Sequence, residues 1–158
     1  MDIPRRVLMG TDFSDYSKEA FDDAVLLAKQ FGAELYLLHV FDVPTYIPGV
    51  ASVAGPEVFE WIRTFREEEQ KRLETLAEEV RKKGVTVHPI LKEGVPFREI
   101  PKTAKEVAAD LIVLGTHGRT GLDRLMMGSV AERVARRAPC RILLVRPKAL
   151  IDKGGENL

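Results

Sequence analysis

The chain has 158 residues with 24 basic and 24 acidic side chains, and 45% of its residues are hydrophobic. This length and balance predict one globular domain with a substantial core, and they exclude a disordered chain. The neutral net charge argues against nucleic acid or an acidic membrane as the main partner, so any charge that binds phosphate must be local.

The chain contains one cysteine, Cys140, so no disulfide can form within it, which is typical of a reducing compartment. It has no run of about 18 apolar residues that could span a membrane. The apolar residues 7–9 are too few for the core of a signal peptide. We therefore expect a cytoplasmic protein with no membrane partner.

The first 40 residues predict a strand, a helix and a second strand. Residues 6–9 form a short apolar run, and Ser14 and Ser17 after it are candidate N-caps of a helix. Gly32 is a candidate C-cap of the same helix. Residues 34–40 (ELYLLHV) are almost continuously apolar, which indicates a strand buried on both faces.

The middle of the chain predicts a long loop, a long helix and a third strand. Residues 41–56 contain three prolines and two glycines, which indicates a long loop of functional or mobile character. Residues 57–83 have helical periodicity, and residues 85–91 predict a strand in which Pro89 favours an edge position or a bulge. The expected buried stripe of the helix consists of Val58, Ile62, Phe65, Leu73, Leu76 and Val80.

The last third repeats the alternation. Residues 97–107 predict a helix whose start is uncertain because of Pro101, and residues 110–114 predict a strand. A helix over 129–137 and a strand over 141–145 follow.

Five strands joined through helices predict a single α/β domain, a doubly wound, Rossmann-like parallel sheet with four helices. We expect this domain to span residues 1–148 and residues 149–158 to be a flexible tail. Ligands of such sheets bind beyond the carboxyl ends of the strands.

A glycine-rich segment follows the fourth predicted strand. Gly115, Gly118 and Gly128, followed by Ser129, give the spacing G-x2-G-x9-G-S, which arises by chance in under about one percent of chains of this length. Glycines can approach a ligand closely and adopt positive φ, and the N-terminus of a following helix favours anions. The segment lacks the lysine of a Walker loop and the GxGxxG spacing of dinucleotide sites. It therefore predicts a phosphate site of another kind.

Simpler interpretations exist for several of these residues. Ser129 and Glu132 match a capping box, and Asp12 could serve only as a helix N-cap. The strand residues His39 and His88 are interpreted as packing residues, and the three histidines are too widely spaced for a metal site. Trp61 is interpreted as a core or lid contact.

The glycine spacing, the TDFS sequence at 11–14 and the ELYLLHV strand together resemble the universal stress protein family, in its ATP-binding type. The resemblance covers residues 5–146. It implies a parallel sheet in the order 3-2-1-4-5, ATP at the carboxyl ends of the strands, and a homodimer.

The resemblance also implies a set of binding residues. Those expected around the adenine and ribose are Gly10, Thr11, Asp12, Val40, Leu114 and Gly115. Those expected around the phosphates are Thr116, His117, Gly118, Arg119, Gly128, Ser129 and Val130. ATP-binding members often have proline or alanine where this chain has Gly10, a departure that loosens the first turn but blocks nothing.

Two functions are compatible with this pattern. The first is a regulatory module that binds ATP, with Mg²⁺ or Mn²⁺ carried by the phosphates, and that has no catalytic residues. The alternative is an enzyme that slowly hydrolyses ATP or transfers an adenylyl group, although no second carboxylate or P-loop lysine is evident. The sequence leaves open whether the protein also binds another, unknown protein.

The final strand, Arg141–Val145, is expected at a sheet edge with an aliphatic middle. Such edges invite pairing with another strand. The expected homodimer pairs two copies of this strand across a two-fold axis.

Overall fold

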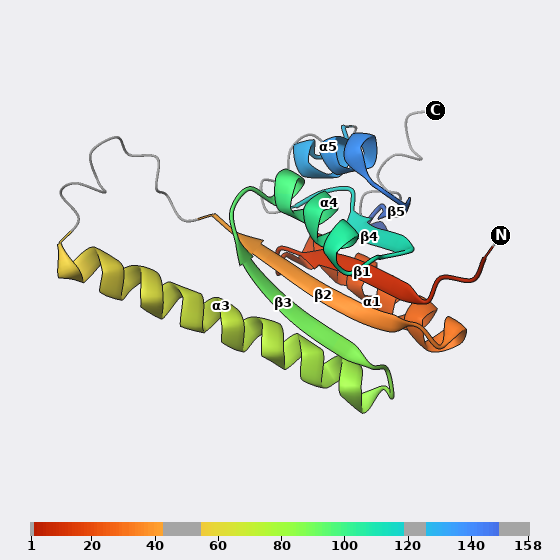
Figure 1. Ribbon diagram of the computed structural model, residues 1–158, viewed down its shortest axis with the longest axis horizontal. Helices are drawn as coiled ribbons and strands as arrows, with labels where there is room; N and C mark the ends of the chain where they lie inside the picture. The colour runs from red at the N-terminus through yellow and green to blue at the C-terminus, as the bar shows by residue number, and fades with distance from the viewer. Residues whose placement is uncertain (1, 43–54, 119–125, 149–158) are drawn as a thin grey trace.

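The computed structural model describes residues 2–42, 55–118 and 126–148. Its strands form one parallel sheet in the order β3-β2-β1-β4-β5 (Figure 1). They are β1 (Arg6–Thr11), β2 (Glu34–Phe41), β3 (Val87–Glu93), β4 (Leu111–Gly115) and β5 (Arg141–Val145). This confirms the predicted fold class and strand order. Pro89 lies in β3, which is an edge strand as expected.

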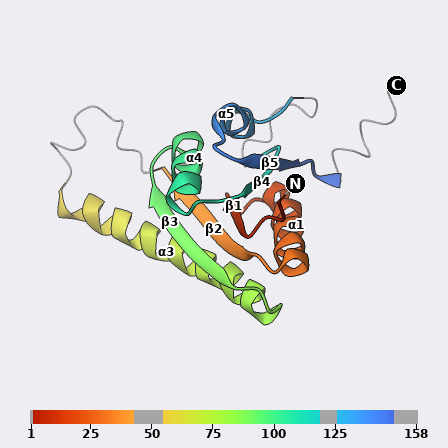
Figure 2. The same ribbon diagram turned by 45° about the vertical axis from the view of Figure 1, so that its right-hand side comes forward.

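Four described helices cover the two faces of the sheet. They are α1 (Asp15–Phe31), α3 (Pro56–Lys82), α4 (Pro96–Glu106) and α5 (Ser129–Arg137). Helices α1 and α3 lie on one face, and α4 and α5 lie on the other (Figures 1 and 2). None of the helices in the described ranges is long and apolar enough to cross a membrane.

Alternate strand residues build two separate cores, because successive side chains of a strand point to opposite faces. Leu35 and Leu37 of β2 pack on the α1–α3 face, whereas Leu38 and Val40 pack on the α4–α5 face. His39 belongs by this alternation to the α1–α3 face, near the carboxyl end of β2. A charged or polar side chain at this depth requires a buried partner.

The helix boundaries confirm some capping predictions and correct others. Ser14 is the N-cap of α1 and accepts a hydrogen bond from the Ser17 amide, and Gly32 is its C-cap with φ of 63°. The capping box at Ser129 is wrong, because the N-cap of α5 is Gly128 and no side chain caps this end. Helix α4 starts at Pro96 and contains Pro101 in its interior.

The prediction for α3 was right in extent and wrong in detail. Its fully buried residues are Glu69, Leu73, Ala77 and Val80, so the N-terminal half of the expected stripe is only partly buried. Trp61 is 56% exposed and is therefore not a core residue, and it stacks on Phe65 with ring centroids 5.9 Å apart. Most of the predicted loop 41–56 and the predicted tail lie outside the described residues.

Candidate functional site

A pocket of about 510 Å³ opens at the carboxyl ends of the central strands. It lies where β1 adjoins β4, the place at which the strand order reverses. Open α/β sheets bind their ligands at this position. The volume falls within the range of small-molecule sites, about 300–1,000 Å³.

The structure places twelve of the thirteen predicted site residues on this pocket. Arg119 lies outside the described residues. The twelve come from the ends of β1, β2 and β4, from the segment after β4, and from the start of α5. They are Gly10, Thr11, Asp12, Val40, Leu114, Gly115, Thr116, His117, Gly118, Gly128, Ser129 and Val130.

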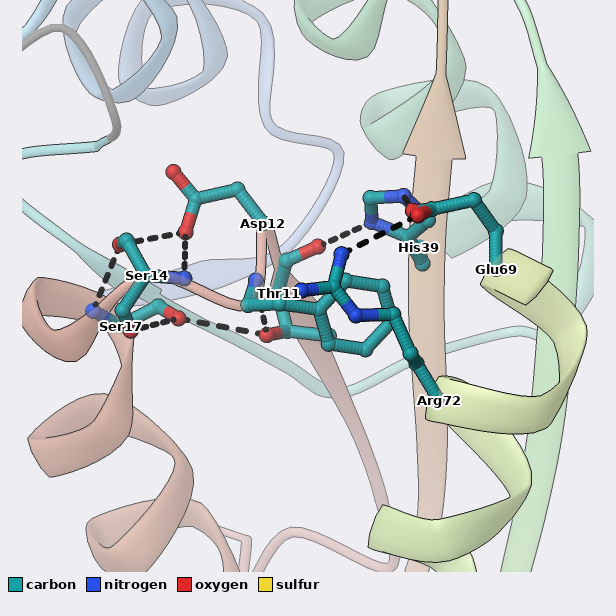
Figure 3. A network of polar contacts seen from close by, with 8 residues as sticks. Thr11, Asp12, Ser14, Ser17, His39, Glu69 and Arg72 are labelled. Carbon is teal, nitrogen blue, oxygen red and sulfur yellow. Dashed lines mark hydrogen bonds and ion pairs between the residues drawn. The ribbon is translucent and has the colours of Figure 1, made fainter. Parts of the chain in front are cut away.

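The turn between β1 and α1 presents Asp12 to the pocket (Figure 3). Asp12 Oδ1 accepts hydrogen bonds from the Ser14 amide at 3.0 Å and from Ser14 Oγ at 2.6 Å. The Phe13 amide donates to Thr11 Oγ1 at 3.1 Å, and Phe13 adopts a left-handed φ of 61°. Such a conformation is unfavourable for a residue with a side chain, so surrounding contacts must hold it.

The glycines around the pocket are required for space. A Cβ on Gly118 would lie 2.7 Å from Asp12 Oδ2, and one on Gly128 would lie 2.9 Å from the Thr116 carbonyl oxygen. The expectation that these glycines adopt positive φ is wrong: φ of Gly128 is −60°, and Gly118 is outside that region. The segment after β4 therefore packs tightly on both the Asp12 turn and the start of α5.

Gly10 also has a steric role. It is a residue of β1 rather than of the turn, and a Cβ there would lie 2.6 Å from Leu114 Cδ2. The interpretation that Gly10 merely loosens the first turn is therefore corrected. A larger residue would displace Leu114, which itself lines the pocket.

His117 supplies a buried polar atom at the pocket. The residue is 7% exposed, and its Nδ1 lies 2.8 Å from Thr116 Oγ1. Its Nε2 has no hydrogen-bond partner within the described ranges. Because burying such an atom without a partner is unfavourable, this position suits a ligand that offers an oxygen.

Sequence reasoning missed two titratable residues of the site, His39 and Glu69, which also line the pocket. His39 Nε2 lies 2.6 Å from Glu69 Oε2, and both side chains are 4% exposed. The interpretation of His39 as a plain packing residue is therefore wrong. One signal was available: Glu69 precedes Leu73 by four residues, so it occupies the buried stripe of α3.

Two groups with perturbed pKa values, Asp110 and Cys140, lie at the opposite end of the sheet. The pKa of Asp110 is lowered because its carboxylate accepts hydrogen bonds from the backbone amides of Arg5 and Arg6. Burial raises the pKa of the Cys140 thiol. The described residues contain no cluster of three or more histidine, cysteine or acidic side chains that could hold a metal.

Comparison with known proteins relates the chain to one family. Residues 4–146 match the family model described as Universal stress protein family. Universal stress protein MJ0531 of Methanocaldococcus jannaschii is 40% identical over 142 residues, 90% of this chain and 82% of that protein. Universal stress protein YxiE of Bacillus subtilis is 37% identical over 145 residues, 89% of this chain and 98% of that protein.

Two solved structures extend the comparison. That of MJ0577 from M. jannaschii superposes with a TM-score of 0.79 at 30% identity, covering 92% of this chain and 98% of that chain. A universal stress protein in complex with cAMP superposes with a TM-score of 0.66 at 26% identity, with the same coverage.

Proposed function

The chain belongs to the universal stress protein family, and we propose that within it this protein is a regulatory module that binds ATP in the pocket between β1 and β4. The cAMP complex of a 26% identical family member supports an adenine nucleotide as the class of ligand. The choice of ATP rests on the glycine spacing after β4. The triphosphate needs more hydrogen-bond donors than cAMP, and the G-x2-G-x9-G-S spacing is the sequence pattern that predicts them.

One observation carries the proposal: residues from separate parts of the chain meet at a single pocket. This pocket combines tight glycines with a buried His117 Nε2 that has no hydrogen-bond partner among the described residues. Turn glycines with only a structural role would not require this convergence. The arrangement is that of a phosphate cradle, in which backbone approaches the ligand and a side chain donates to it.

The pocket suggests a division of roles. Asp12, at the end of β1, would accept hydrogen bonds from the ribose hydroxyls, and Val40 would pack on the base. His117 would donate from Nε2 to a phosphate oxygen, with Nδ1 accepting from the Thr116 hydroxyl. The Ser129 amide lies at the start of α5, where the helix dipole favours a negative charge, whereas the Gly128 amide already donates to the Thr116 carbonyl oxygen at 2.7 Å.

A divalent cation would be brought by the nucleotide. Mg²⁺ usually keeps several waters and binds through phosphates and one or two carboxylates, and Asp12 is the acidic side chain placed nearest the cradle glycines. MgATP should therefore bind more tightly than ATP in EDTA. Equal affinity in calorimetry would contradict a role for the cation.

The regulatory function is favoured over an enzymatic one by the composition of the pocket. Phosphoryl transfer needs a positioned nucleophile and charge stabilisation at the γ-phosphate. His39 and Glu69, the titratable pair that sequence reasoning missed, are already paired with each other. We expect turnover below about one per minute, against the usual 1–10³ per second of enzymes.

Two measurements on one preparation test this proposal. Mass spectrometry of the denatured purified protein should detect a bound adenine nucleotide, and phosphate release from MgATP should stay at background. Rapid phosphate release that follows the protein through every purification step would favour the slow ATPase instead.

We also propose that two copies pair through β5. This strand is at the sheet edge, and Leu143 is 36% exposed. Leu144 packs in the core of the α4–α5 face, so Leu143→Lys tests the contact with less harm to the fold. Light scattering should give a dimer for the wild type and a lower mass for the variant. A wild-type mass of 17.7 kDa at tens of micromolar would defeat the pairing.

A further inference from the structure

A polar cluster joins α3 to the turn that follows β1 (Figure 3). It consists of the buried His39 from β2, the buried Glu69 from α3 and the exposed Arg72 from α3. His39 Nδ1 lies 2.8 Å from the Thr11 carbonyl oxygen, and its Nε2 lies 2.6 Å from Glu69 Oε2. Arg72 Nη1 lies 3.2 Å from the other oxygen of Glu69. The cluster thus runs from the helix through the histidine to the backbone of β1.

The contacts determine where hydrogens lie on the His39 ring. A carbonyl oxygen only accepts, so Nδ1 must carry a hydrogen and donate it to Thr11. Nε2 faces Glu69 Oε2 at an ion-pair distance of 2.6 Å, and neither of these two atoms has a hydrogen-bond partner in the described part of the chain. Arg72 contacts the other oxygen of Glu69 and so helps to hold this carboxyl group in place. The His39 ring is therefore held at Nδ1 by Thr11 and faces α3 at Nε2.

The same cluster also contacts Phe13, another residue of the turn. The Phe13 ring makes two contacts with the cluster. Its centroid lies 4.3 Å from that of the His39 ring, and the Arg72 guanidinium lies 5.2 Å from it. Phe13 is the residue with the left-handed φ of 61°. Hydrogen bonding to Thr11 and packing on Phe13 thus hold both residues that flank Asp12.

Asp12 is the acidic group that this turn presents to the pocket. Its Oδ2 lies so close to residue 118 that only glycine fits there without a clash. A shift of the Thr11 carbonyl would therefore move Asp12 relative to the segment after β4. Glu69 lies on α3, in a different layer of the fold from the turn. Its contact with His39 nevertheless links it to the geometry of the predicted ribose and phosphate contacts.

We propose that Glu69 is a positioning residue for the nucleotide pocket. It anchors the His39 ring, whose Nδ1 donates to Thr11, and so fixes the Thr11–Phe13 turn and the Asp12 carboxylate. The effect on nucleotide affinity rests on the proposed function, whereas the effect on the turn does not. In this account α3 influences the ligand through two side chains that need not contact it.

The test compares three variants of the full chain. Glu69→Leu removes the carboxyl group that faces Nε2, so the His39 ring loses its polar contact with α3 and is held by the Thr11 carbonyl oxygen through Nδ1. Glu69→Gln keeps a hydrogen-bonding group of the same shape and should rescue the effect. Ala77→Gly is the control, because it weakens the same buried stripe of α3 at a residue outside the cluster.

Three readouts separate positioning from general destabilisation. Titration with MgATP should give affinity about tenfold weaker for Glu69→Leu, within the range for residues that act without touching the ligand. Glu69→Gln and Ala77→Gly should bind within about twofold of the wild type. The ¹⁵N spectrum of the His39 imidazole should show Nδ1 as a hydrogen-bond donor in the wild type and a changed Nδ1 signal in Glu69→Leu. Amide exchange at residues 13–17 should become faster in Glu69→Leu alone.

The outcomes are distinguishable from failure of the proposed function. If Glu69→Leu folds, binds MgATP as the wild type does and protects residues 13–17 equally, the proposal is overturned. Equal losses in Glu69→Leu and Ala77→Gly would also overturn it. If the wild type does not bind MgATP, the nucleotide claim fails with the proposed function, and the exchange and ¹⁵N data still decide whether Glu69 positions the turn.

Discussion

Each end of the sheet carries a histidine–glutamate pair, and the two pairs differ in almost everything except chemistry. His39 and Glu69 lie at the carboxyl end, 2.6 Å apart with both side chains 4% exposed. His88 and Glu34 lie at the other end of β3 and β2, 2.7 Å apart, with side chains 44% and 47% exposed. The distance alone would rank them as equals.

Burial and neighbours give the two pairs different consequences. The buried pair lines the pocket and is tied to backbone and to Arg72. In the exposed pair, the His88 ring stacks on the Tyr36 ring with centroids 4.7 Å apart, and neither His88 nor Glu34 belongs to the described pocket lining. Water can replace either partner of an exposed pair, but a buried group that loses its partner keeps the cost of desolvation. Burial of the side chains and their further contacts therefore indicate a role in the site, whereas the distance within the pair does not.

The largest expected difference comes from matched substitutions of the two glutamates. Glu69→Leu should lower the free energy of unfolding by about 3 kcal/mol, because it strands a buried histidine. Glu34→Leu should leave it within error of the wild type. Urea unfolding at neutral pH measures both. Similar losses in the two variants would break the comparison.

A smaller effect is expected for Asp110, at the same end of the sheet as the exposed pair. Its folded pKa is lowered because it accepts hydrogen bonds from the amides of Arg5 and Arg6, at 2.8 and 2.9 Å. The stabilisation is therefore fully present above the unfolded pKa and is lost as pH falls through the folded pKa. Asp110→Asn should cost about 1 kcal/mol at pH 7. Its difference from the wild type should shrink below pH 4, and an undiminished difference at pH 2 would contradict this.

The smallest effect concerns the exposed pair itself. The hydrogen bond from His88 lowers the pKa of Glu34, so its stabilisation is lost as pH falls through that lowered value. In His88→Gln, NMR titration should find the pKa of Glu34 raised towards its ordinary value. The pKa of Glu106, which a hydrogen bond from Lys92 lowers, should not change. A shift at both glutamates would mean that His88 acts on more than its own neighbour.

Most of the fold could be predicted from the sequence, because periodicity and capping are local signals. The strand Arg141–Val145 and the helix Ser129–Arg137 match the prediction residue for residue. The third strand starts two residues later than expected: the Val85 amide still bonds back to Val80 of α3, so the ladder begins only at Val87. The apolar pattern alone does not predict this hydrogen bond from Val85 back to the end of the helix.

The residues of the pocket could be predicted only where a motif marks them. The glycines after β4 and the TDFS turn carry such a motif, and the structure places their described members together. The contacts of the left-handed Phe13 with His39 and of His39 with Glu69 join residues 26 and 30 positions apart, which no local pattern connects. Likewise, the steric demand at Gly10 comes from Leu114, a residue on the neighbouring strand.

The central claim is that the glycine cradle binds ATP, and calorimetric titration with MgATP tests it most directly. The wild type should bind one nucleotide per chain. Gly118→Val should bind about a hundredfold more weakly, equivalent to about 2.7 kcal/mol, because its Cβ would meet Asp12 Oδ2 at 2.7 Å. The matched control Gly55→Val, where a Cβ meets no atom of the described residues within 4 Å, should bind as the wild type does. No binding by the wild type, or equal affinity in Gly118→Val and the control, would contradict the claim.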